Sequence, residues 1–73
     1  MNELECIYDK SLIDKLKKRI STLYPEETLS IIDVKDDDED CEFVSFTVRY
    51  YSPKWLVWLG KEMQYVRTYF KVL

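Results

Sequence analysis

The densest set of groups in this sequence that could do chemistry is a run of carboxylates. The run consists of Asp36, Asp37, Asp38, Glu39 and Asp40, and carboxylate oxygens are ligands that calcium and magnesium prefer. An EF-hand loop starting at Asp36 would need glycine at its sixth position and glutamate at its twelfth. The chain has Cys41 and Thr47 at those positions, so we expect no specific metal site.

The acidic run has two other interpretations. It can be a solvated turn between two strands, which also discourages edge-to-edge aggregation. It can instead be a docking feature that engages a basic surface on a partner protein. Adjacent carboxylates repel one another and cost stability, and a turn needs only a few polar residues. The excess of charge keeps the docking interpretation open.

Catalytic chemistry finds little support elsewhere in the chain. The sequence contains no histidine and only two cysteines, Cys6 and Cys41, whereas a structural zinc site normally takes four such ligands. Glu62 lies among apolar residues, where it either forms a salt bridge with a basic residue of the preceding helix or reaches solvent at a rim. A general acid at Glu62 would need a second catalytic group, which the sequence does not supply. We therefore expect a non-enzymatic protein without a cofactor.

The cysteine count and the apolar runs also bear on where the protein acts. Two cysteines without a secretory segment in residues 1–10 favour free thiols in a reducing cytoplasm. The longest apolar run, residues 55–59, has five residues, against about 20 in a membrane-spanning helix. We therefore expect a cytoplasmic protein that does not span a membrane.

Three segments have the composition of β-strands. Residues 3–8 alternate, and so do residues 42–51, whose apolar face consists of Val44, Phe46, Val48 and Tyr50. Residues 28–35 are less regular, because Ile31 and Ile32 cannot both face inward, which implies a β-bulge or partial burial of both faces. The acidic run joins the last two segments, so we expect them to form an antiparallel hairpin.

The segment from residue 9 to residue 25 has the periodicity of an amphipathic helix. Its apolar stripe consists of Leu12, Leu16, Ile20 and Leu23, widened by Ile13 and Tyr24. Asp9 or Ser11 is the expected N-cap. Pro25 should end the helix, because proline disfavours helical geometry at the residue before it.

A second helix should follow Ser52 as N-cap, with Pro53 in its first turn, and should run to about Val72. One apolar sector of this helix consists of Trp55, Leu56, Leu59, Met63, Val66, Phe70 and Leu73, and a second sector of Trp58, Tyr65, Tyr69 and Val72. Together they span about 200° of the helix, more than the stripe that one sheet covers. Either the sheet and the first helix bury both sectors, or Trp58, Tyr65 and Tyr69 stay exposed as a partner or dimer surface.

These elements predict one α+β domain over residues 1–73, in the order β-α-β-β-α, with two helices packed on one face of a three-stranded sheet. That element order resembles the DinI family of DNA-damage-inducible recombinase regulators. The acidic C-terminal helix by which that family is thought to mimic DNA is absent here, where the last helix carries Lys54, Lys61, Arg67 and Lys71. The resemblance therefore implies a topology and no function.

Charge is distributed unevenly along the chain. Residues 33–42 contain seven acidic residues and one lysine, a local charge of −6, whereas the remainder has ten basic and seven acidic residues, a charge of +3. This polarity and the small size are typical of an accessory or inhibitory factor of the kind that phages and mobile elements encode. We expect a protein partner with a basic surface, reached through Asp36–Asp40 and anchored by Trp58, Tyr65 and Tyr69, with a homodimer as a further use of these residues. The alternative is nucleic-acid binding by the basic helix faces.

Overall fold

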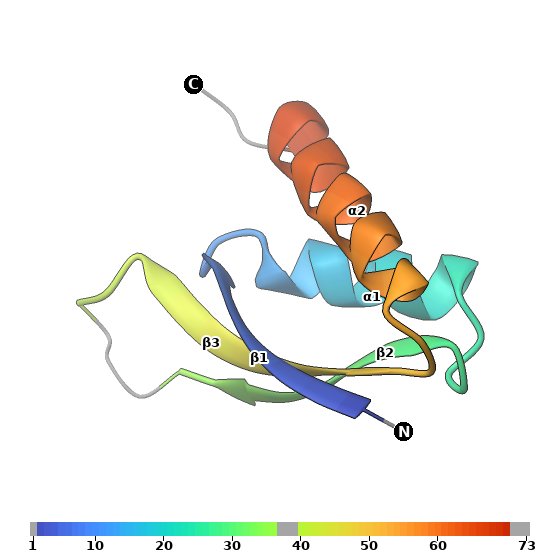
Figure 1. Cartoon of the computed structure of the whole chain (residues 1–73). Helices are drawn as coiled ribbons and strands as arrows, with labels where there is room; N and C mark the ends of the chain where they lie inside the picture. Colours follow the sequence, from blue (N-terminus) through green and yellow to red (C-terminus); the bar gives the residue numbers. More distant parts are fainter. Residues whose placement is uncertain (1, 37–39, 71–73) are drawn as a thin grey trace.

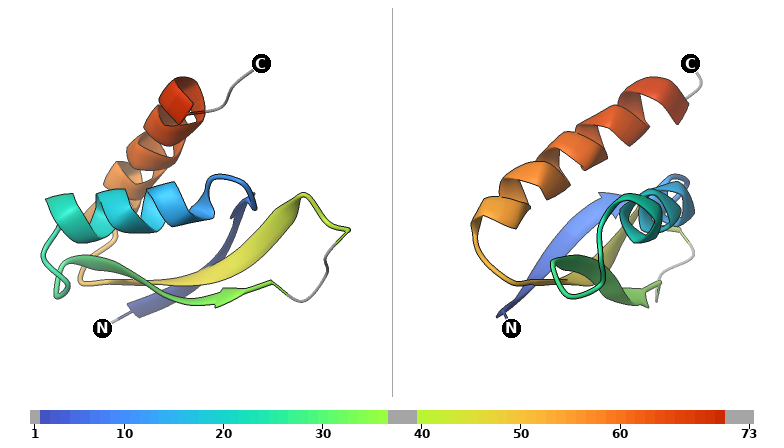
Figure 2. Two further views of the ribbon diagram at one scale, coloured as in Figure 1. Left: turned by 180° about the vertical axis from the view of Figure 1, so that it is seen from behind. Right: turned by 90° about the vertical axis from the view of Figure 1, so that its right-hand side faces the viewer.

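Both helices of this chain lie on one face of a three-stranded antiparallel sheet (Figures 1 and 2). The computed structural model describes residues 2–36 and 40–70. Its elements are β1 (Asn2–Asp9), α1 (Ile13–Leu23), β2 (Leu29–Lys35), β3 (Phe43–Tyr50) and α2 (Lys54–Phe70). The predicted α+β fold and its element order are confirmed.

The last strand of the chain, β3, is the central strand of the sheet. The strand order is β1-β3-β2, with β3 antiparallel to both neighbours, so β1 and β2 run parallel to each other and α1 connects them across β3. The predicted hairpin of β2 and β3 is therefore confirmed. Both alternatives for β2 are observed. The register shifts between Ile31 and Val34, as in a bulge, and Asp33 adopts a φ of 68° there. Ile31 and Ile32, on opposite faces, are each partly buried. Aspartate enters this left-handed region more readily than a β-branched residue does.

The hydrophobic core lies between the sheet and the two helices. It consists of Tyr8, Leu12, Ile13, Leu16, Ile20, Leu29, Val44, Phe46, Val48, Leu59 and Val66. The alternation predicted for β3 is confirmed, since Val44, Phe46 and Val48 are all buried. Burial of these apolar side chains is the main force that holds the helices on the sheet.

The start of α1 differs from the prediction. The helix begins at Ile13, with Leu12 at the N-cap position and no side-chain capping bond there in the described structure, so the prediction of Asp9 or Ser11 as the cap is wrong. A turn separates β1 from the helix, in which the Leu12 N–H donates to the Asp9 carbonyl at 3.0 Å. The Asp9 carboxylate instead accepts hydrogen bonds from Arg67 of α2, at 3.1 and 3.3 Å.

The helix α1 ends where predicted, but one residue of its predicted apolar stripe is exposed. Tyr24 takes extended geometry, with φ −123° and ψ 133°, as expected for the residue before Pro25. Leu23 was predicted to face the core and is 52% exposed. It lies in the last turn of α1, beyond the buried residues Leu16 and Ile20.

The two ends of α2 were predicted approximately. The helix begins at Lys54, one residue later than predicted, after bonds from the Trp55 N–H to the Ser52 carbonyl and from the Leu56 N–H to the Pro53 carbonyl. The structure describes it to Phe70, so the predicted end near Val72 lies outside the described residues. Phe70 was predicted to be a core residue and is 43% exposed, because the C-terminal turns of α2 rise away from the sheet (Figure 1).

Gly60, the single glycine of the chain, occupies an exposed position in the middle of α2. Apart from its chain neighbours and the nearby backbone of α2, nothing in the described part of the chain lies within 4 Å of a Cβ atom added there. Alanine loses less backbone entropy than glycine when a helix forms. We therefore expect Gly60→Ala to raise the free energy of unfolding by about 1 kcal/mol, measured by urea denaturation. An unchanged or lower midpoint would contradict this expectation.

Two expectations about the whole chain can be compared with the structure. Within residues 2–36 and 40–70, neither helix combines the length and the apolar character that a bilayer crossing requires. Cys6 and Cys41 are both free thiols, as predicted. Burial raises the pKa of the Cys6 thiol, and the neighbouring Glu5 carboxylate adds to this increase, so Cys6 is a weak nucleophile.

Candidate interaction surface

The candidate for acid–base chemistry, Glu62, pairs with a basic residue of the first helix. Its side chain is buried in α2, and the Arg19 Nε of α1 donates a hydrogen bond to its Oε2 at 2.6 Å. Of the two readings of Glu62, the salt bridge to the first helix is therefore the one that the structure shows. The described residues contain no group of three or more cysteine, aspartate or glutamate side chains that could hold a metal ion.

Arg19 of α1 contacts two side chains of α2, Glu62 and Tyr65. Besides its bond to Glu62, its guanidinium carbon lies 3.6 Å from the centroid of the Tyr65 ring. The Tyr65 ring in turn lies 4.4 Å from the Tyr69 ring, centroid to centroid. A guanidinium held over an aromatic face is attracted by the electrons of the ring. The arrangement restrains the Tyr65 side chain without burying it.

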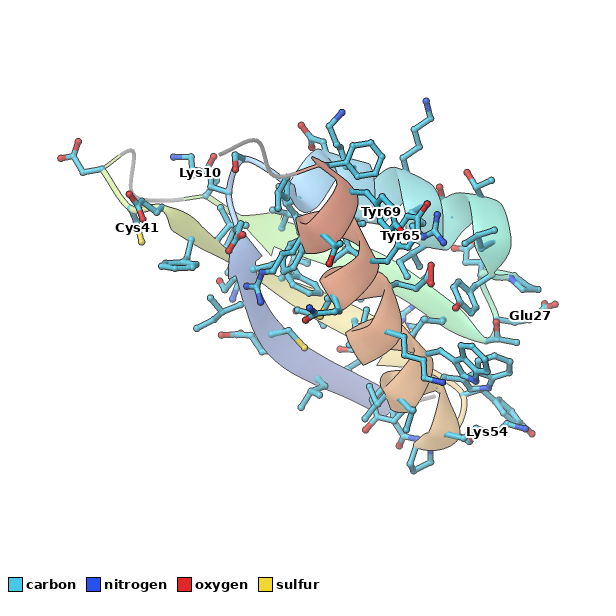
Figure 3. All side chains as sticks on the ribbon, turned by 90° about the horizontal axis from the view of Figure 1, so that it is seen from above. Lys10, Glu27, Cys41, Lys54, Tyr65 and Tyr69 are labelled. Carbon is cyan, nitrogen blue, oxygen red and sulfur yellow. The ribbon has the colours of Figure 1, made fainter. Side chains whose placement is uncertain are left out.

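The second sector predicted for the last helix is exposed in its described residues, and Val72 lies outside them. Trp58 is 45% exposed, Tyr65 37% and Tyr69 68%. Tyr65 and Tyr69 point from α2 toward α1 (Figure 3), and the Lys61 ammonium lies 4.6 Å from the Trp58 ring centroid. We call Trp58, Tyr65 and Tyr69 the aromatic row. Its exposure favours the second of the two alternatives for this sector, in which the row remains available to a partner.

A groove next to the aromatic row was not anticipated from the sequence. It runs between α1 and the end of α2, has a volume of about 310 Å³, and is lined by Lys15, Lys18, Arg19, Thr22, Leu23 and Phe70. The Lys15 ammonium lies 4.9 Å from the Phe70 ring centroid. We call these six residues the helix groove. The only sequence signal for it is that Leu23 and Phe70 are the last apolar residues of their stripes in the described helices, where the sheet no longer covers them.

Comparison with known proteins adds no relative to this picture. No family model, no curated protein and no solved structure matches the chain. The resemblance to the DinI family therefore remains one of element order.

The acidic run is described only at its two ends. The Lys10 ammonium lies 2.9 Å from the Asp36 Oδ1, which ties the start of the run to the turn between β1 and α1. Asp37, Asp38 and Glu39 lie outside the described residues. Asp40 is exposed. One acidic residue at the start of the predicted docking feature is thus paired with a lysine of the same molecule.

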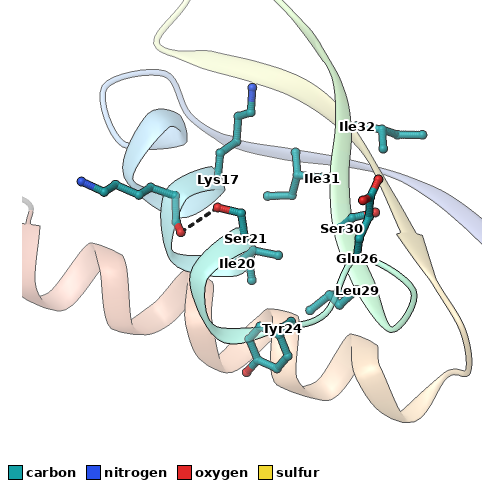
Figure 4. A pocket seen from close by; sticks show the side chains of 10 residues that line it. Lys17, Ile20, Ser21, Tyr24, Glu26, Leu29, Ser30, Ile31 and Ile32 are labelled. Carbon is teal, nitrogen blue, oxygen red and sulfur yellow. Dashed lines mark hydrogen bonds between the residues drawn. The ribbon is translucent and has the colours of Figure 1, made fainter.

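A larger cleft lies between α1 and β2 (Figure 4). It has a volume of about 560 Å³, and its rim carries Lys17 and Lys18 from α1 and Glu26 from the following turn. The Ser30 Oγ, which lines the cleft, is buried without a hydrogen-bond partner among the described residues. Because Lys17 and Lys18 line the same cleft as Glu26, the cleft favours neither sign of ligand charge.

The face of the sheet that the helices leave uncovered carries paired charges. Arg49 donates to the Glu3 carboxylate at 2.9 Å, and the Lys35 ammonium lies 3.8 Å from the Glu5 carboxylate. The Glu3 and Glu5 carboxylates on this face would repel a polyanion such as nucleic acid.

Proposed function

We propose that this protein is a small non-enzymatic binding factor, of accessory or inhibitory type, that recognises another protein through the aromatic row. The observation that carries the proposal is the exposure of Trp58, Tyr65 and Tyr69 on one side of α2. Tryptophan and tyrosine are enriched in interface hot spots, because they bury a large area with few rotatable bonds. We further propose that it acts in the cytoplasm, where Cys6 and Cys41 would stay reduced.

Restraint of the row within the free protein would favour binding. Tyr65 already contacts Arg19 and Tyr69 in the free protein. The Tyr65 side chain would therefore lose little conformational entropy when a partner covers it. The acidic run supplies a second element of the proposal. Carboxylates at Asp36–Asp40 would steer the protein toward a basic surface, and the aromatic row would then anchor the complex.

The aromatic row is tested by affinity capture from the native host. We expect wild-type protein to retain a partner that Trp58→Ala/Tyr65→Ala/Tyr69→Ala loses, since truncation of hot-spot aromatics commonly weakens binding by more than ten-fold. The control is Tyr51→Ala/Val57→Ala, which shortens two exposed apolar side chains that do not belong to the row. Capture of the same proteins by wild-type and triple variant would reject the row as the anchor.

The acidic run is tested separately by association kinetics with the captured partner. Conversion of Asp36, Asp37, Asp38 and Asp40 to asparagine and of Glu39 to glutamine removes five charges without a large change in shape. We expect the association rate to fall and its dependence on salt to flatten, while the dissociation rate changes little. An unchanged association rate at low ionic strength would remove the run from the mechanism.

Nucleic-acid binding is the second candidate, favoured by one observation. Three basic side chains, Lys15, Lys18 and Arg19, line the helix groove together with the Phe70 ring, and cations beside an aromatic ring suit a single strand. Fluorescence anisotropy with a labelled single-stranded oligonucleotide tests it. Binding at low salt that added salt abolishes would support this candidate, and no change at micromolar protein would exclude it.

A further inference from the structure

We propose that the helix groove receives a second copy of this chain, whose exposed sheet residues Ile7 and Phe43, flanked by Glu5 and Glu42, dock into it. We call these four residues the sheet patch. The inference concerns a pair of surfaces distinct from the aromatic row and holds whether or not the row binds another protein. Its basis is that one molecule carries both halves of a complementary contact.

The helix groove combines positive charge with an apolar wall. Lys15 and Lys18 are exposed on α1, and Arg19 lines the same groove. Leu23 and Phe70 supply the apolar surface and are 52% and 43% exposed. The lining residues include no acidic side chain. An occupant should therefore bring an apolar side chain and negative charge.

The sheet patch has that chemistry. Phe43 is 49% exposed and Ile7 is 65% exposed, on adjacent strands in which Ile7 pairs with Ser45 and Asp9 with Phe43. Ile7 and Phe43 are thus diagonal neighbours on the uncovered face of the sheet. Glu5 lies two residues before Ile7 on the same face of β1. The exposed Glu42 comes immediately before Phe43 in the chain. Lys35 offsets Glu5 only weakly, because their 3.8 Å contact joins two side chains that are both more than half exposed.

The position of the two surfaces determines the kind of assembly. Both helices lie on one face of the sheet (Figure 2), the sheet patch lies on the other face, and the helix groove is lined by residues of α1 and α2, so one molecule cannot join its own two surfaces. Surfaces on opposite sides of a molecule join copies head to tail, and each added copy leaves one groove and one patch for the next. Each contact is small by itself, so we expect association that is weak and depends on concentration.

Sedimentation equilibrium of the purified full chain tests the inference directly. We expect reversible head-to-tail self-association, beginning with dimers, that weakens as the salt concentration rises. Lys15→Glu/Lys18→Glu, which reverses the charge of the helix groove, and Phe43→Ser, which removes the apolar anchor, should each weaken self-association by at least about ten-fold. The control is Lys17→Glu/Lys54→Glu, with the same change in net charge outside the groove, and it should associate like wild-type protein.

A mixing experiment distinguishes this head-to-tail arrangement from other modes of self-association. The groove variant retains a sheet patch and the Phe43→Ser variant retains a helix groove, so one contact can form between the two variants. We expect a heterodimer in an equimolar mixture at concentrations at which each variant alone is monomeric. A wild-type chain that stays monomeric at low salt, a groove variant that associates like the control, or a mixture that stays monomeric would each overturn the inference. The proposed function would stand in all three cases, because its test depends on the aromatic row.

Discussion

Replacement of Tyr8 by alanine is expected to unfold most of this protein at room temperature. Tyr8 is fully buried at the end of β1, and its hydroxyl donates a 2.6 Å hydrogen bond to the Met63 carbonyl of α2. Truncation of a buried aromatic ring costs about 3–5 kcal/mol. A domain of 73 residues has only about that much stability in total. Circular dichroism and the dispersion of NMR amide signals measure the loss.

The matched substitution, Tyr8→Phe, separates the ring from its hydroxyl. It keeps the buried ring and leaves the Met63 carbonyl without its donor, at an expected cost of about 1–2 kcal/mol in the free energy of unfolding. The variant should therefore fold, with a lower urea midpoint. If Tyr8→Ala were as stable as Tyr8→Phe, burial of the Tyr8 ring between β1 and α2 would not contribute to stability as its packing implies.

The same hydroxyl makes stability depend on alkaline pH. Burial raises the pKa of the Tyr8 phenol from its ordinary value of 10 to about 12. The folded state disfavours the phenolate. The stabilisation that the hydroxyl contributes to the folded state is therefore complete below pH 10 and is lost as the pH rises toward 12. The difference in unfolding free energy between wild-type protein and Tyr8→Phe should shrink across that window. Cys6 and Tyr24, whose pKa values burial also raises, are common to both proteins and cancel in the comparison.

The parts of the fold that were predictable from the sequence are those that local patterns control. Alternation fixed the inward face of β3, where Val44, Phe46 and Val48 are buried. Two adjacent isoleucines in β2 could not both face inward, and the chain resolves this conflict with a bulge at Asp33. The acidic residue in the apolar arc of α2 required a partner, and Arg19 of α1 supplies it.

The wrong predictions arose where the outcome depends on how elements lie relative to one another. Periodicity assigns Leu23 and Phe70 to core stripes, but the stripe extends past the sheet, and both residues contribute instead to the helix groove. Asp9 has the residue type of a helix cap, yet Arg67, distant in sequence, captures its carboxylate. Such contacts require the crossing of α2 over the sheet, which no local pattern specifies.

Removal of Arg19 is expected to destabilise the protein more than removal of Glu62, although the two side chains share one salt bridge. Arg19→Met leaves the buried Glu62 carboxylate without its guanidinium in a position that water reaches poorly. Glu62→Met places an apolar side chain in the apolar arc of α2 and leaves Arg19, which is partly exposed, free to turn toward solvent. We expect a clear drop in the urea midpoint for Arg19→Met and a small change, or an increase, for Glu62→Met.

The double variant identifies the cause of this asymmetry. Arg19→Met/Glu62→Met should recover most of the stability that Arg19→Met loses, because no charge is then left buried. If the two single variants lost equal stability, the attraction between Arg19 and Glu62, and not the burial of the Glu62 charge, would determine what the salt bridge contributes to stability.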